Sequence, residues 1–207
     1  MKELLERYPQ LGICKNSIAK AVEKIVKCYE NGGKVLICGN GGSCADSDHI
    51  VGELMKGFLK KRPITWEKKS EMKSKCPELS DDVLCGLQEA LPAISLCSLT
   101  ALNTAFSNDA DPDMIYAQSV YGLGRESDVF IGISTSGNAV NVYLAACVAR
   151  SLGMTVIGLT GKDGGKIKDV SDVCVIVPEN ETYKIQELHL PIYHYICAAV
   201  EGHFFSE

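Results

Sequence analysis

The sequence contains no run of about 18 apolar residues, the length that a membrane-spanning helix requires. Its first ten residues, MKELLERYPQ, lack the apolar stretch of a secretory signal. Acidic residues outnumber basic ones by 26 to 21, so the basic surface typical of nucleic-acid binders is also missing. These absences predict a cytoplasmic protein that binds neither a membrane nor a nucleic acid.

The ten cysteines include no C-x-x-C pair, the spacing of many zinc and redox sites. Most of them stand inside apolar helix or strand patterns: Cys14, Cys28, Cys38, Cys97, Cys147, Cys174 and Cys197. We therefore expect reduced thiols that behave as small buried hydrophobic side chains in a reducing cytosol.

Short apolar segments alternate with helical patterns along the chain. Strands are expected at 35–38, 93–97, 129–134, 155–160 and 173–178, and a long last helix at 182–204. Because these strands are apolar throughout, both faces of their sheet should be covered by helices. The sequence predicts an α/β fold, a three-layer αβα sandwich around a mostly parallel five-stranded sheet. We expect one domain over residues 1–207, with an insertion at about 60–92.

The predicted insertion shows no clear periodicity, and its first half is basic and holds the only tryptophan, Trp66. Such a segment inside a compact domain is either a surface excursion or a functional lid. As a lid, it would close over an anionic substrate with a set of basic side chains: Lys60, Lys61, Arg62, Lys68 and Lys69.

Three hydroxyl residues and a glycine follow the third strand, in the order Ser134, Thr135, Ser136, Gly137 and Asn138. We expect this segment to open a helix, where free N–H groups and the helix dipole favour an anion. Hydroxyl donors and a glycine that permits close approach suit a phosphate. The alternative is an ordinary serine N-cap without a ligand, which would need only one hydroxyl.

A second glycine-rich loop follows the first strand, with Asn40, Gly41, Gly42 and Ser43 as candidate substrate-binding residues. It is neither a G-x-G-x-x-G loop nor a Walker loop, so a nucleotide cofactor is not expected. Asn40 offers a side-chain amide to a sugar hydroxyl. The alternative is a tight strand-to-helix turn that needs the same glycines.

His49 and Glu53 are four residues apart on a predicted helix and therefore share a face. On the last helix, Gln186 and His194 fall on roughly the same side. A Glu and a His beside a sugar phosphate suit the proton transfers of aldose–ketose isomerisation. The same four residues could instead hold zinc, or simply be polar residues of amphipathic helices.

Several motifs occur in order along the chain: CGNGGS at 38–43, His49 with Glu53, Ser107-Asn108-Asp109, GISTSGN at 132–138, LTGKDGGK at 159–166, and IQELH followed by His194. In this combination the chain resembles the sugar isomerase (SIS) domain family, and within it the phosphoheptose isomerases. The resemblance covers nearly the whole chain outside 60–92.

This resemblance implies interconversion of sedoheptulose 7-phosphate and a glycero-manno-heptose 7-phosphate, with Glu53 as catalytic base and His194 as catalytic acid. It implies zinc in some members, at positions that match His49, Glu53, Gln186 and His194. It also implies a homotetramer with active sites between subunits, which would explain how Glu53 and His194 meet. Matching substrate-binding positions are Asn40, Gly41, Gly42, Glu53, Asn108, Asp109, Ser134, Thr135, Ser136 and Gln186.

Two departures from the family pattern leave alternatives open. Ala139 stands where the family usually has a serine, and the insertion at 60–92 is longer than the usual connection. Either change could indicate another sugar phosphate as substrate. A non-catalytic alternative is a sugar-phosphate sensor or an adaptor that binds the replication initiator protein. Retention of both Glu53 and His194 favours catalysis over that alternative.

Overall fold

The computed structural model describes residues 1–205, which build one five-stranded sheet. Its strands are β1 (Val35–Gly39), β2 (Ala93–Ser95), β3 (Val129–Ser134), β4 (Thr155–Thr160) and β5 (Val173–Ile176). All neighbouring strands pair in parallel, in the order β2-β1-β3-β4-β5. The five predicted strands are therefore confirmed, with β2 and β5 each two residues shorter than expected.

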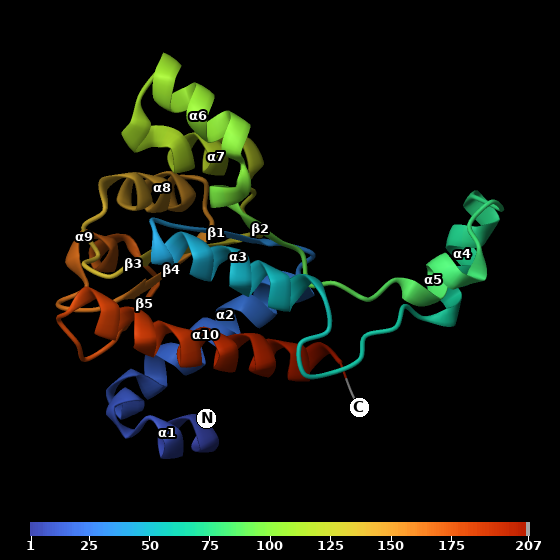
Figure 1. The fold of residues 1–207 in the computed structure, drawn as a ribbon, viewed down its shortest axis with the longest axis horizontal. Helices are drawn as coiled ribbons and strands as arrows, with labels where there is room; N and C mark the ends of the chain where they lie inside the picture. Colours follow the sequence, from blue (N-terminus) through green and yellow to red (C-terminus); the bar gives the residue numbers. More distant parts are fainter. Residues whose placement is uncertain (206–207) are drawn as a thin grey trace.

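Helices cover both faces of the sheet (Figure 1). One face packs against α2 (Lys15–Glu30), α3 (Gly42–Met55) and α10 (Thr182–Phe204), and the other against α7 (Ile115–Leu123), α8 (Val140–Ser151) and α9 (Gly165–Val170). Along β1, Val35 and Ile37 join the first core, whereas Leu36 and Cys38 join the second. This alternation of apolar residues confirms the three-layer sandwich.

Several short elements were not expected from the sequence. They are α1 (Lys2–Arg7), η1 (Pro9–Cys14), η2 (Leu96–Ser98), α6 (Thr100–Asp109) and η3 (Pro112–Met114), together with α7 and α9. Helix α6 buries none of its residues, so its sequence carries little of the apolar periodicity that reveals a helix. Within residues 1–205, no helix is both long and apolar enough to cross a membrane.

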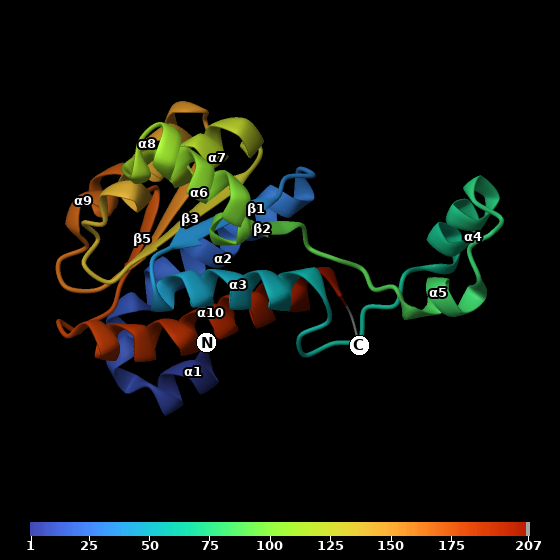
Figure 2. The same cartoon turned by 45° about the horizontal axis from the view of Figure 1, so that its top comes forward.

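Residues 60–92, here called the arm, extend away from the sheet and its helices in both views (Figures 1 and 2). The arm contains two helices, α4 (Trp66–Lys75) and α5 (Asp81–Gly86). Each begins at a side-chain cap, since Thr65 accepts from the Lys68 N–H and Ser80 from the Val83 N–H, both at 3.3 Å. The absence of clear periodicity at 60–92 therefore reflects short capped helices with little buried surface.

One expected lid residue does not fit that role. The Arg62 side chain is fully buried at the root of the arm and forms an ion pair with Glu201 on α10. The side chain of Lys60 donates a hydrogen bond to the Phe205 carbonyl, and that of Lys68 donates to the Glu89 carboxylate. The assignment of Arg62 to a substrate-covering lid is wrong, because its charge is already neutralised inside the protein.

The buried side of α10 contains a neutral histidine. His189 is completely buried, its Nε2 donates to the Thr160 carbonyl at 3.2 Å, and its Nδ1 has no partner. Burial lowers the pKa of His189 to about 4, because a charged imidazole would lose its hydration there.

Acid should therefore destabilise the fold through His189. The unfolded side chain takes up a proton below a pKa of about 6.5, whereas the folded one resists protonation until about pH 4. Its stabilising contribution is complete above about pH 6.5 and is lost as the pH falls towards 4. We expect the free energy of unfolding in urea to fall between pH 7 and pH 5, and to fall by about 2 kcal/mol less in His189→Gln than in wild type. In the exposed control His203→Gln it should fall as much as in wild type. An equal fall in all three proteins would contradict this account.

Candidate active site

Two loops meet where the strand order reverses. From β1 the chain crosses to β2 on one side, whereas β3 lies on the other side of β1. In open α/β sheets, ligands bind at such a point beyond the carboxyl ends of the strands. The Asn40 amide donates to Asn141 Oδ1 at 2.8 Å, and the Asn141 amide donates back to Asn40 Oδ1 at 3.0 Å. This pair joins the β1 loop to the first turn of α8, and Asn141 was not identified from the sequence.

The segment 134–138 forms a separate turn rather than the start of a helix. Its Gly137 N–H donates to the Ser134 carbonyl at 3.0 Å, and α8 begins only at Val140. The N-cap of α8 is Ala139, which has no side-chain acceptor, so the alternative of a serine N-cap is wrong. Gly137 has a φ of +66°, and a Cβ there would lie 1.9 Å from the Gly164 carbonyl oxygen. Glycine is therefore required where this turn packs against the β4–α9 loop.

The predicted substrate residues of the β1 loop are placed differently from one another. Asn40, Gly41 and Gly42 are exposed, whereas Ser43 is 3% exposed and its N–H donates to the Asn40 carbonyl. Gln186 lies against this loop, because a Cβ on Gly42 would come 2.4 Å from Gln186 Nε2. The structure thus brings Gln186 from α10 to the start of α3.

Asn108 and Asp109 stand apart from these loops, at the end of α6. The Asn108 amide donates to the Asp109 carboxylate at 2.7 Å. Neither side chain is hydrogen-bonded to the β1 or β3 loop within residues 1–205. Their predicted substrate contacts remain a prediction.

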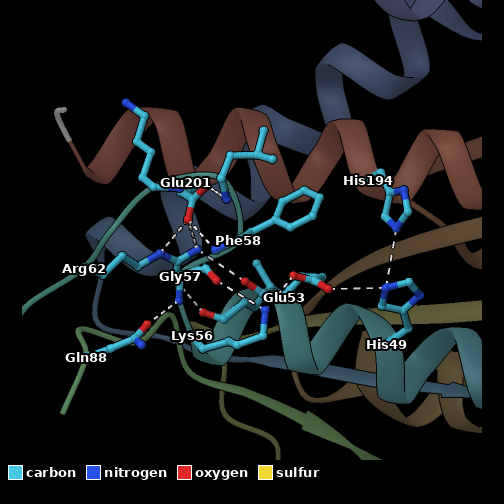
Figure 3. A network of polar contacts seen from close by, with 12 residues as sticks. His49, Glu53, Lys56, Gly57, Phe58, Arg62, Gln88, His194 and Glu201 are labelled. Atoms are coloured by element: carbon cyan, nitrogen blue, oxygen red, sulfur yellow. Dashed lines mark hydrogen bonds and ion pairs between the residues drawn. The ribbon is translucent and has the colours of Figure 1, made fainter. Parts of the chain in front are cut away.

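Glu53 and His194 are brought together through His49 (Figure 3). His49 Nε2 lies 3.3 Å from Glu53 Oε1 and 3.5 Å from His194 Nε2. Glu53 Oε2 also accepts from Lys56 Nζ at 3.0 Å. All of these residues belong to one chain, so the meeting of Glu53 and His194 needs no second subunit. The expectation that a tetramer would explain it is corrected here.

Tyr193 and Asp46 orient the ring of His49. The Tyr193 hydroxyl donates its single proton to Asp46 Oδ1 at 3.1 Å and lies 3.0 Å from His49 Nδ1. His49 Nδ1 can therefore donate to the Tyr193 oxygen, while its Nε2 faces Glu53 and His194. Burial raises the pKa of Asp46, and burial with the nearby Asp46 raises that of Tyr193. Neither residue was identified from the sequence, although Asp46 precedes His49 by three residues and so shares its helix face.

His194 is half-buried among aromatic rings. The rings of Tyr193, Phe58 and His49 have their centres 5.1, 5.6 and 5.0 Å from the His194 ring. Burial, and then the neighbouring His49, lower the pKa of His194. The lowered pKa favours the neutral form of this imidazole.

No preformed metal site exists within residues 1–205, because no three His, Cys, Asp or Glu side chains are arranged to hold an ion. The distances from His49 Nε2 to Glu53 Oε1 and to His194 Nε2 are nevertheless close to those between two ligands of one zinc ion. Atoms bound about 2.0–2.1 Å from zinc lie about 3.3 Å from one another in a tetrahedron. His49 Nε2 and Glu53 Oε1 are 3.3 Å apart. A contact of this length suits either a hydrogen bond from Nε2 to the carboxylate or a cation bound by both atoms.

The chain resembles known proteins along most of its length. A model of the SIS domain matches residues 2–78 and 88–161. The phosphoheptose isomerase of Clostridium acetobutylicum is 40% identical over 190 residues, which cover 92% of this chain and 84% of that protein. The phosphoheptose isomerase of Helicobacter pylori strain P12 is 38% identical over 203 residues, which cover 98% of this chain and 91% of that protein. The solved structure of the phosphoheptose isomerase of Neisseria gonorrhoeae aligns with a TM-score of 0.76 at 33% identity. The alignment covers 97% of this chain and 94% of that one.

Ala139→Ser should stabilise the start of α8. A serine hydroxyl at the N-cap would accept a first-turn N–H that Ala139 leaves without a side-chain partner. We expect a gain of about 1 kcal/mol, or about 2–4 °C in the midpoint of thermal unfolding for a chain of this size. The matched control is Ala139→Gly, which caps without a hydroxyl. A serine variant no more stable than the glycine variant would contradict the cap assignment.

Proposed function

The chain belongs to the SIS domain family, in its phosphoheptose isomerase branch, and from this membership we propose an acid–base reaction with Glu53 as base and His194 as acid. The enzyme is an aldose–ketose isomerase of a phosphorylated sugar. Its substrate is sedoheptulose 7-phosphate, and its product a glycero-manno-heptose 7-phosphate. The proposal rests on one observation: Glu53 and His194 both contact His49, on the helix that follows the glycine-rich β1 loop.

The reaction moves one proton between two neighbouring carbons. Glu53 removes a proton from C1 of the ketose while His194 donates its N–H proton to the carbonyl oxygen at C2, giving an enediol. The proton held by Glu53 then returns to C2, and the hydroxyl proton on O1 goes back to the imidazole, which leaves an aldehyde at C1. A neutral imidazole can fill this role as an electrophile: its N–H is donated to O2 as negative charge develops there, and the ring regains a proton from O1 in the second step.

The phosphate end of the substrate is assigned to the loops after β1 and β3. Gly42 at the start of α3 precedes His49 by seven residues, about 10 Å along the helix. A sugar phosphate of several carbons can bridge that separation. Backbone N–H groups and the hydroxyls of Thr135 and Ser136 supply donors without a lysine or arginine. Asn40, Gln186, Asn108 and Asp109 complete the proposed substrate contacts.

The alternatives from the sequence are less well supported. Relatives at 37–40% identity are named phosphoheptose isomerases, which favours a heptose over another sugar phosphate. A sensor or adaptor would need no acid–base pair, whereas here Glu53 and His194 both reach His49. Catalysis therefore accounts for more of the side-chain arrangement.

The proposal includes a zinc ion held by His49, Glu53 and His194, with Gln186 as the fourth ligand. Support comes from the two ligand-like distances at His49 Nε2 and from its Nδ1 contact with Tyr193, an outer partner of the kind that orients metal-binding histidines. The Gln186 amide lies against Gly42, and Gln186 is about 12 Å from His194 along α10, so its side chain would have to turn towards His49 to bind the same ion. Zinc would polarise the substrate carbonyl as a Lewis acid.

A cytoplasmic homotetramer remains part of the proposal. A groove of about 780 Å³ lies between α1 and α10, bordered by apolar residues that include Leu4, Tyr8, Leu59 and Leu190. Leu59 and Leu190 are 71% and 41% exposed, and apolar surface of this kind favours association. His194 also borders the groove, so a second subunit docked there would shape the site. The free cysteines suit a reducing compartment.

Glu53→Gln and His194→Ala should each lower turnover of sedoheptulose 7-phosphate by about 10²–10⁴-fold, because each removes one proton-transfer group. Substrate should still raise the midpoint of thermal unfolding in both variants, since the phosphate loops are intact. His203→Ala, an exposed histidine on the same helix, is the matched control and should keep wild-type turnover. Near-wild-type turnover in either site variant would refute the assigned roles.

Metal removal should lower activity if zinc is bound as proposed. We expect about one zinc per chain by elemental analysis, loss of turnover after dialysis against a chelator, and recovery on adding zinc. His49→Ala should lower the bound zinc, whereas His203→Ala should not. Full turnover by metal-free protein would exclude the metal from the reaction.

A further inference from the structure

A buried ion pair that the proposed reaction does not use links the arm to the body. Both Arg62 Nε and Arg62 Nη2 lie 2.8 Å from Glu201 Oε1. The exposed fractions of the two side chains are 0% and 1%. Buried pairs of this kind add little net stability, so their value lies in fixing the groups around them.

Arg62 also caps the helix that carries Glu53. Its Nη1 donates to the Leu54 carbonyl at 2.7 Å, and its Nη2 donates to the carbonyl of Glu53 itself at 3.3 Å (Figure 3). These are carbonyls of the last turn of α3, which have no partner within the helix. The guanidinium thereby joins the backbone of the proposed base directly to α10.

Glu201 holds the segment that follows α3. Its Oε1 accepts the Phe58 N–H at 2.8 Å, and its Oε2 accepts those of Leu59 and Lys60 at 2.8 and 3.2 Å. Burial alone would raise the pKa of Glu201, but the hydrogen bonds from Phe58, Leu59 and Arg62 outweigh it and lower the pKa. The carboxylate therefore stays charged and keeps the ring of Phe58 against His194, 5.6 Å between centres.

The proposed acid and base lie between two ties that link α3 to α10. At one end, Tyr193 on α10 contacts Asp46 and His49 on α3. At the other end, Glu201 stands seven residues beyond His194, about two helical turns along α10, and contacts Arg62. Glu53 and His194 occupy the interval, so a shift at Arg62 changes their separation.

We propose that Arg62 and Glu201 are positioning residues for the isomerisation, because together they set the spacing of Glu53 and His194. This inference rests on the proposed function. Misplacing reacting groups by about 1 Å can cost about 10²-fold in rate. The phosphate loops lie at the opposite end of α3 and should be unaffected.

The test is Arg62→Lys, which keeps the charge but loses the fork that contacts three acceptors at once. We expect kcat to fall roughly 10- to 100-fold while KM stays within about twofold. Glu201→Gln should give the same pattern, and it serves if the lysine variant folds poorly. Assays are run well below each variant's unfolding midpoint, so that a loss of stability alone leaves kcat unchanged.

The matched control is Asp128→Asn. Asp128 is 3% exposed and forms an ion pair with the partly exposed Lys34, 2.5 Å apart, at the opposite end of β1. We expect this variant to lose stability without losing kcat. Wild-type kcat in Arg62→Lys and Glu201→Gln, or an equal loss in Asp128→Asn, would overturn the positioning role.

A second readout does not depend on turnover. In protein labelled with ¹⁵N-histidine, the imidazole resonances of His49 and His194 should shift in Arg62→Lys and stay in place in Asp128→Asn. Failure of the wild type to isomerise sedoheptulose 7-phosphate would refute the proposed function, while these resonances would still report the helix spacing. Unshifted resonances in Arg62→Lys would refute the positioning role even in an active enzyme.

Discussion

The packing of α3 against α10 is the contact on which the active site depends. Ile50 and Leu54 from α3 and Ile192 and Cys197 from α10 share one hydrophobic core over the sheet. Apolar burial brings two helices together but is not directional, so by itself it leaves their relative register loosely defined. Directional contacts at both ends of the helix pair, at Tyr193 and at Glu201, supply that register. The placement of Glu53 and His194 on either side of His49 Nε2 follows from this geometry.

Most of the sheet could be predicted because its strands are apolar on both faces. Segments such as 129–134 and 155–160 agree with the structure residue for residue. Helix α6 was missed for the opposite reason, since it has no buried residue and so no apolar stripe. The arm shows the same limit, because α4 also buries none of its residues. A helix that is mostly exposed to solvent needs no apolar face, so the spacing of its apolar residues does not reveal it.

The candidate site divides in a similar way into local and long-range features. Helical spacing alone paired His49 with Glu53, and glycine with hydroxyl clusters marked both loops. Contacts between distant segments could not be read from spacing, as for Asn40 with Asn141, 101 residues apart. Arg62 is the clearest case. In sequence it belongs to an apparently solvated basic run, yet 139 residues later stands the glutamate that draws it into the interior.

The distribution of thiols makes the arm chemically distinct from the rest of the chain. Of the ten free cysteines, only Cys76 and Cys85 are exposed, and both are on the arm. The other eight are buried or half-buried in the body. A maleimide dye or a nitroxide spin label would therefore attach first to the arm of the unmodified protein. Fluorescence anisotropy or electron resonance could then follow the arm directly, with the native sequence left intact.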